Sequence, residues 1–103
     1  MSIDKRQHTR HAISLKVRYP SLSDFIEDYT ANISIGGCFL HSNQVFEMEQ
    51  TFDLTLQLPD GHEIQTQAIV RWVSTNPEFA GVGVQFVVIS RRDQRLIERL
   101  VGS

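Results

Sequence analysis

Alternation of apolar and polar residues is the dominant pattern along the chain, and it predicts β-strands. It is clearest between Phe52 and Leu58, where Leu54 and Leu56 share the apolar face and polar side chains lie between them. A strand with this period of two turns one face toward a core and the other toward solvent. Comparable segments lie at residues 13–19, 25–34, 37–42, 62–74 and 80–89.

The connections between these segments and the C-terminal segment complete the expected fold. Pro59-Asp60-Gly61 is typical of a tight hairpin turn. Residues 90–101 instead show helical spacing, with Leu96, Ile97 and Leu100 on one stripe. The predicted fold class is all-β with a terminal helix: a small six-stranded antiparallel β-barrel plus a C-terminal α-helix.

The first eleven residues lack any apolar period, so we expect a flexible N-terminal arm over residues 1–11 and a barrel domain over residues 12–103. The arm contains Lys5, Arg6 and Arg10, whereas the whole chain has a formal net charge of −2. Basic charge gathered at one end suits a small anion, and the acidic balance argues against a nucleic-acid partner.

Other classes of protein find little support in the sequence. No apolar run approaches the roughly 20 residues of a membrane span, so we expect no membrane insertion and a cytoplasmic location. The single cysteine, Cys38, excludes an internal disulfide and is expected to be a small buried hydrophobe. His8 and His11 lack further ligands at metal-binding spacing. We therefore expect neither an enzyme nor a metal or cofactor.

Residues 32–37 have the composition of a ligand platform. In an extended strand, Asn32 and Ser34 point to one face while the isoleucines between and after them turn inward. Gly36 and Gly37 permit a positive φ or a close approach to a bound group. An ordinary turn is the alternative interpretation of the same six residues.

The two polar motifs together resemble the two-part signature of the PilZ domain family, bacterial receptors for cyclic di-GMP. Arg6-x-x-x-Arg10 matches the first part, and Asn32-x-Ser34-x-x-Gly37 matches the second. The resemblance covers nearly the whole chain, because later family segments are similar to residues 58–61, 69–72 and 81–86.

The resemblance implies a cyclic di-GMP receptor or adaptor whose arm changes conformation on binding and signals to an unidentified protein effector. Arginine side chains can pair with guanine, stack on a base or clamp a phosphate, which are the roles implied for Arg6 and Arg10. Asn32, Ser34 and Gly37, with Gly36 beside them, would form the opposing shelf. Motility and biofilm formation are the processes that the resemblance implies.

Three positions leave details of the site open. Lys5 stands where many members have arginine, and a basic residue there is associated with a stacked pair of cyclic di-GMP molecules. Asn32 stands where many members have aspartate. Trp72 either lines the site or anchors the core, and the core is favoured because Trp72 continues the series of Ala68 and Val70.

Alternative functions remain at this point. One is a PilZ-like protein-interaction adaptor that does not bind nucleotide. Another is a small oligonucleotide-binding barrel, disfavoured by the acidic balance and by few candidate aromatic residues on the surface. We expect a monomer or a weak dimer.

Overall fold

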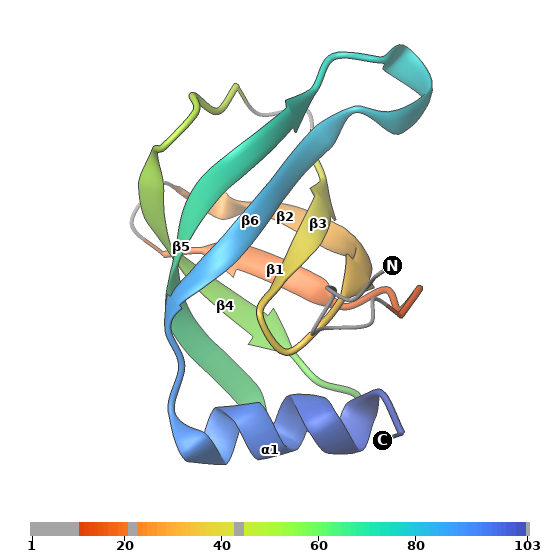
Figure 1. Ribbon diagram of the computed structural model, residues 1–103, viewed down its shortest axis with the longest axis vertical. Helices are drawn as coiled ribbons and strands as arrows, with labels where there is room; N and C mark the ends of the chain where they lie inside the picture. The colour runs from red at the N-terminus through yellow and green to blue at the C-terminus, as the bar shows by residue number, and fades with distance from the viewer. Residues whose placement is uncertain (1–10, 21–22, 43–44, 103) are drawn as a thin grey trace, which may run out of the picture.

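The computed structural model describes residues 11–20, 23–42 and 45–102. Six strands close into a barrel, and one helix lies across one end of it (Figure 1). The elements along the chain are β1 (Lys16–Tyr19), β2 (Ser23–Ile33), β3 (Gly37–His41), β4 (Thr51–Gln57), β5 (Glu63–Ser74), the 3₁₀ turn η2 (Pro77–Phe79), β6 (Gly81–Val88) and α1 (Arg91–Leu100).

The strands follow the order β1-β2-β3-β6-β5-β4 around the barrel, and every neighbouring pair is antiparallel. Pairing of β1 with β4, in which Val17 lies opposite Leu56, closes the sheet on itself. Closure removes the exposed edges that an open sheet would present. The expected fold class, a six-stranded antiparallel barrel with a C-terminal helix, is confirmed.

The core is built from rows of apolar side chains that cross neighbouring strands in register. Ile33 lies opposite Cys38, Cys38 opposite Val84, and Val84 opposite Val70. All four side chains are buried. Directly opposed residues point to the same face of a sheet, so this row crosses four strands of the barrel interior. The burial expected of Cys38 is confirmed.

The chain before β1 is held by a side chain in place of a regular strand ladder. The alternation predicts a strand from Ile13, whereas β1 begins at Lys16. The Thr30 hydroxyl donates to the Ile13 carbonyl oxygen at 2.6 Å and accepts from the Leu15 N–H at 2.8 Å. This side chain satisfies backbone groups that a neighbouring strand would otherwise pair.

Trp72 does not anchor the core, which corrects the expectation drawn from the sequence. The register between β5 and β6 shifts between Val70 and Trp72, so Arg71 is the extra residue of a bulge. An extra residue reverses the alternation of faces beyond it. Val70 is buried as expected, but Trp72 is 57% exposed and lies on the outer face of the barrel.

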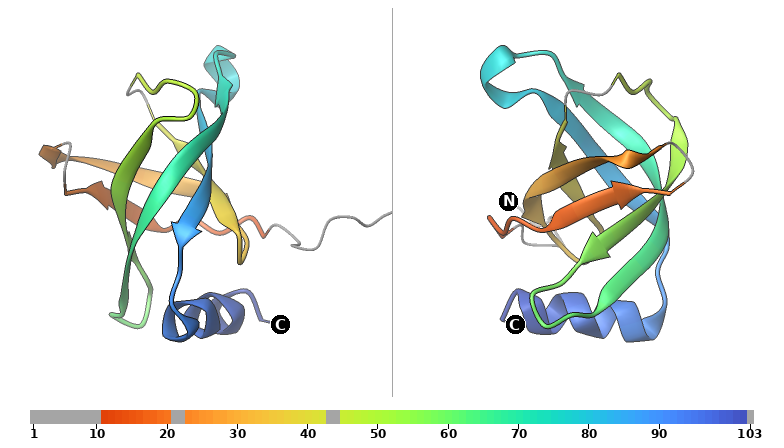
Figure 2. Two further views of the ribbon diagram at one scale, coloured as in Figure 1. Left: turned by 60° about the vertical axis from the view of Figure 1, so that its left-hand side comes forward. Right: turned by 180° about the vertical axis from the view of Figure 1, so that it is seen from behind.

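Helix α1 follows the prediction closely. The Ser90 side chain caps it by accepting a hydrogen bond from the Asp93 N–H at 3.0 Å. Leu96 and Ile97 are buried, and the helix lies across the barrel end in each view (Figure 2). No helix in the described part of the chain is long and apolar enough to cross a membrane.

Candidate ligand-binding site

The hairpin between β2 and β3 uses its serine to hold its own turn. The Ser34 N–H donates to the Gly37 carbonyl oxygen at 2.8 Å. Its hydroxyl donates to the same oxygen and accepts from the Gly36 N–H, both at 3.3 Å. Ser34 is only 3% exposed. The Ser34 hydroxyl therefore bonds to the backbone of its own turn and stabilises the conformation of that turn.

The glycines of this turn lie against strand β6. A Cβ atom at Gly37 would lie 2.1 Å from the Val84 carbonyl oxygen, closer than any side chain allows. The Gly36 carbonyl oxygen accepts a hydrogen bond from the Phe86 N–H at 2.9 Å. The positive φ values at glycine fall elsewhere in the described chain, at residues 61, 81 and 102. Close approach of two backbones thus accounts for Gly37.

A second row of residues crosses the same four strands on the outside of the barrel. Asn32 lies opposite Phe39, Phe39 opposite Gly83, and Gly83 opposite Trp72. The rings of Phe39 and Trp72 pack with their centroids 5.3 Å apart. A Cβ atom at Gly83 would lie 3.5 Å from the Trp72 side chain, an ordinary van der Waals distance, so the indole lies over β6 at this position. We call these four residues the outer shelf.

A guanidinium lies beside the outer shelf. Arg71 donates from Nε to Gln85 Oε1 at 2.9 Å and from Nη1 to Glu49 Oε1 at 3.1 Å. Gln85 is opposite Gly37 in the sheet, so the contact links the arginine to the motif turn. The described side chains of this face offer aromatic stacking, amide hydrogen bonds and one cation. The guanidinium is paired with the Glu49 carboxylate, so these groups suit a planar ligand that stacks and hydrogen-bonds.

The sequence did not single out Phe39, Arg71 or Gln85 as candidates. Phe39 lies within an apolar run and was indistinguishable from its core neighbours, while Arg71 and Gln85 lie in strands whose register the pattern does not reveal. The only available signal was the arginine beside a tryptophan in a segment similar to the PilZ family.

The N-terminal arm joins the barrel at this site. The His11 N–H donates to the Ile33 carbonyl oxygen, and the Ile33 N–H donates to the His11 carbonyl oxygen, both at 2.9 Å. Ile33 lies between Asn32 and Ser34 in the chain, so His11 pairs with the middle of the motif. The remaining predicted site residues, Lys5, Arg6 and Arg10, lie outside the described residues.

The same described segments contain no group of three or more histidine, cysteine, aspartate or glutamate side chains that could hold a metal ion.

Comparisons with known proteins agree with the architecture. The family model for the PilZ domain matches residues 4–103, so the chain belongs to the PilZ domain family. Members of this family are regulatory and adaptor domains. A search of the curated proteins found no match.

Three solved structures are similar to this chain. The Bacillus subtilis inhibitor of motility, MotI/DgrA, has a TM-score of 0.80 at 24% identity, over 94% of this chain and 49% of that one. The PilZ domain of Escherichia coli YcgR with c-di-GMP has a TM-score of 0.70 at 12% identity, over 95% and 89%. The PilZ domain of CeSA from a cellulose-synthesizing bacterium has a TM-score of 0.62 at 14% identity, over 90% and 94%. The chain thus spans about half the length of the B. subtilis protein, and these likenesses show the fold.

Proposed function

We propose that this protein is a cyclic di-GMP receptor that binds the nucleotide between the outer shelf and its N-terminal arm. The observation that supports this most directly is the pairing of His11 with Ile33. His11 is the last residue of the arm and directly follows Arg10 in the chain, so this pairing attaches the arm to the barrel at the second motif. The two motifs are separated by about twenty residues in the chain, and this contact brings the residue that follows Arg10 to the second motif.

Each group of residues has a role that its chemistry supports. The exposed Trp72 ring offers a stacking surface for a guanine base, with Phe39 behind it. Arg6 and Arg10 supply forked donors for guanine edges and phosphates, and Asn32 supplies an amide. Arg71, whose charge Glu49 balances in this structure, offers guanidinium donors at the edge of the shelf.

Other motif residues act on the shape of the site. Ser34, Gly36 and Gly37 hold the turn close to β6 and so set the position of Asn32 at the edge of the shelf. Lys5 supplies a further cation, which would offset the repulsion between phosphates if two nucleotides stacked together.

Signalling follows from the same geometry. Binding orders the arm over the outer shelf, and the free energy for that ordering comes from contacts that exist only in the bound state. The ordered arm presents a surface that a protein effector reads. The regulatory and adaptor character of the family supports this part of the proposal.

Isothermal titration with cyclic di-GMP tests the proposal, with GMP and a short RNA as competitors for specificity. Arg10→Ala removes charge-assisted hydrogen bonds of roughly 1.5–3 kcal/mol, and we expect binding to weaken about tenfold or more. Trp72→Ala removes a stacking surface and should weaken binding by a similar factor.

Arg95→Ala, on the exposed face of α1, is the matched control and should bind as the wild type does. Thermal melting of each variant checks that the fold is intact. Wild-type protein that failed to bind cyclic di-GMP would overturn the proposal and favour an adaptor without nucleotide. Binding that survived both arginine and tryptophan changes would overturn the assignment of the site.

A further inference from the structure

Helix α1 presents a line of positive charge on its solvent side. Arg91, Arg95 and Arg99 follow one another at intervals of four residues, and all three are exposed. Residues four apart lie on one face of a helix, so these side chains form a single stripe about 12 Å long. We call the three residues the arginine ridge.

The arginine ridge as a whole adds little to the stability of the helix that contains it, because only Arg99, in the last turn, lies where the helix dipole favours a cation. Like charges four residues apart destabilise a helix by about 0.2–0.5 kcal/mol per pair, and Arg91 lies at the positive end of the helix dipole. Within the described segments, no ion pair is found for Arg91, Arg95 or Arg99, whereas the adjacent Arg92 pairs with Asp93 at 2.8 Å. Folding of α1 therefore leaves the ridge unexplained.

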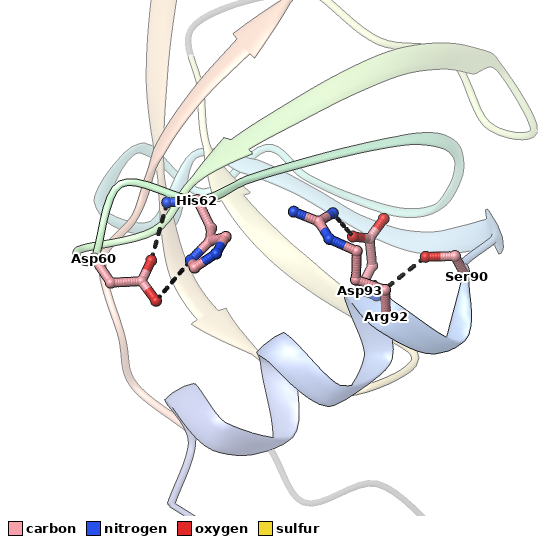
Figure 3. Close-up of polar contacts among 5 residues, drawn as sticks. All are labelled: Asp60, His62, Ser90, Arg92 and Asp93. Carbon is pink, nitrogen blue, oxygen red and sulfur yellow. Dashed lines mark hydrogen bonds and ion pairs between the residues drawn. The ribbon is translucent and has the colours of Figure 1, made fainter.

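An apolar slot meets the ridge at its C-terminal end, where Arg99 lines it. The slot has a volume of about 280 Å³ and opens between the β4–β5 turn and α1; it is lined by Leu58, Pro59, Asp60, Leu96, Arg99 and Leu100. Arg99 belongs to both the ridge and the slot. The other charged side chain that lines the slot is Asp60, which is paired with His62. The Asp60 carboxylate contacts His62 Nδ1 at 2.9 Å and accepts a hydrogen bond from the His62 backbone N–H at 3.0 Å (Figure 3).

We infer that the ridge and slot together form the docking surface for an acidic segment of a partner protein, with one apolar side chain in the slot and carboxylates along the ridge. This inference specifies where the protein effector of the proposed function would bind. It rests on the proposed function only in assuming that such an effector exists. The positive charge of the ridge favours a negatively charged segment, and the apolar slot favours a segment with an apolar side chain that can enter it.

The observations favour a protein segment over a membrane or a nucleic acid. The ridge is short and narrow, with three arginines over about 12 Å, so it offers few contacts to a long polyanion or an anionic lipid surface. A slot of about 280 Å³ accepts an apolar side chain as large as leucine or phenylalanine. An arginine fork pairs well with the planar carboxylates that would flank such an anchor.

Fluorescence anisotropy with a defined probe tests the inference. The probe is a short fluorescein-labelled peptide of glutamates around a central leucine, and a second peptide has serine in place of the leucine. We expect the leucine peptide to bind the wild type in low salt. Replacing two ridge cations in Arg95→Gln/Arg99→Gln should weaken binding about tenfold or more, and the serine peptide should bind more weakly than the leucine peptide.

The control variant Thr51→Glu/Thr75→Glu changes the net charge by the same amount at exposed positions away from the β4–β5 turn, because Thr51 begins β4 and Thr75 follows the end of β5. It should bind the leucine peptide as the wild type does. Circular dichroism confirms that both variants fold. Loss of binding in the control as well as in the ridge variant would mean only a net-charge effect and would overturn the inference.

Further outcomes also decide the question. No binding of the leucine peptide to the wild type, or equal binding of the two peptides, contradicts the inferred surface. Ridge-dependent binding of phosphatidylserine vesicles or a short oligonucleotide without peptide binding contradicts it too, as does a ridge-dependent self-association seen by sedimentation. Titrations of the wild type separate the two proposals: binding of cyclic di-GMP without binding of the leucine peptide overturns only the docking surface, and binding of the peptide without binding of cyclic di-GMP overturns only the nucleotide site. Arg95→Gln/Arg99→Gln should bind cyclic di-GMP as the wild type does.

Discussion

At the scale of single residues, Tyr19 shows how the barrel interior accommodates a polar group. The side chain is completely buried, and its hydroxyl donates to Asp28 Oδ2 at 2.6 Å. Burial, followed by the hydrogen bond and negative charge of Asp28, raises the pKa of Tyr19 well above its usual range. The folded protein therefore holds this proton at a pH at which an unfolded chain releases it.

The pH dependence of stability follows from that raised pKa. Up to about pH 10 the tyrosine is protonated in both states, and above that pH only the unfolded state ionises. We expect the free energy of unfolding to fall as the pH rises above about 10. Urea unfolding at increasing pH measures this, and Tyr19→Phe should flatten the fall while costing about 1–3 kcal/mol near neutral pH. Tyr29→Phe, at a side chain that is 47% exposed, is the control; an equal flattening in both variants would contradict the assignment.

At the scale of elements, the contact between the β2–β3 hairpin and β6 positions the candidate site. Gly37 lies directly against the Val84 carbonyl, and Phe86 donates its N–H to the Gly36 carbonyl oxygen. Asn32 and Phe39 are held on the outer face by the same strands. The motif glycine is thus required by the packing of strands, and the site depends on it indirectly.

Gly37→Ala should therefore lower stability before it affects any ligand. The added methyl group would lie 2.1 Å from a backbone oxygen, and the strands must separate to admit it. We expect a loss of about 1–3 kcal/mol in urea unfolding, as for other overpacked sites. Gly83→Ala is the matched control in the facing strand, because its methyl group would meet Trp72 at an ordinary 3.5 Å. A smaller loss in Gly37→Ala than in Gly83→Ala would show that the hairpin tolerates the added volume.

At the scale of the whole molecule, one continuous core joins the closed barrel to α1. Ile97 is completely buried and belongs to the same cluster as the inward residues of the strands. Strand β1 pairs with both β2 and β4, so separating any strand disturbs two neighbours. Such connections favour a single cooperative transition on unfolding.

Ile97→Ala tests that cooperativity. Removing this side chain should cost about 2–4 kcal/mol through the lost burial and the cavity left behind. Denaturation followed by circular dichroism and by Trp72 fluorescence should give coincident midpoints, both shifted to lower urea, although Trp72 lies on β5 and not on the helix. Val88→Ala, at a side chain that is 70% exposed, should shift neither. If the helix unfolded before the barrel, the two probes would give different midpoints, which would contradict a single cooperative transition.

The sequence alone determined the strands, the helix and the family. Alternation reflects the burial of one strand face, as in β4, and the stripe that contains Leu96 and Ile97 reflects the burial of one helix face. Both elements can therefore be recognised from the local spacing of apolar residues. The two polar motifs pointed to the PilZ family, which the family model confirms.

Tertiary structure alone decided which residues face the candidate site. The bulge at Arg71 turned Trp72 outward, and no local pattern reveals a bulge because it depends on how β5 pairs with β6. Serine and glycine at positions 34 and 37 are as typical of a tight turn as of a ligand shelf. Only the hydrogen bonds of Ser34 and the contact of Gly37 with β6 show that these residues shape the turn. The pairing of His11 with Ile33 joins segments far apart in the chain, and such a long-range contact follows from closure of the barrel, which local spacing does not encode.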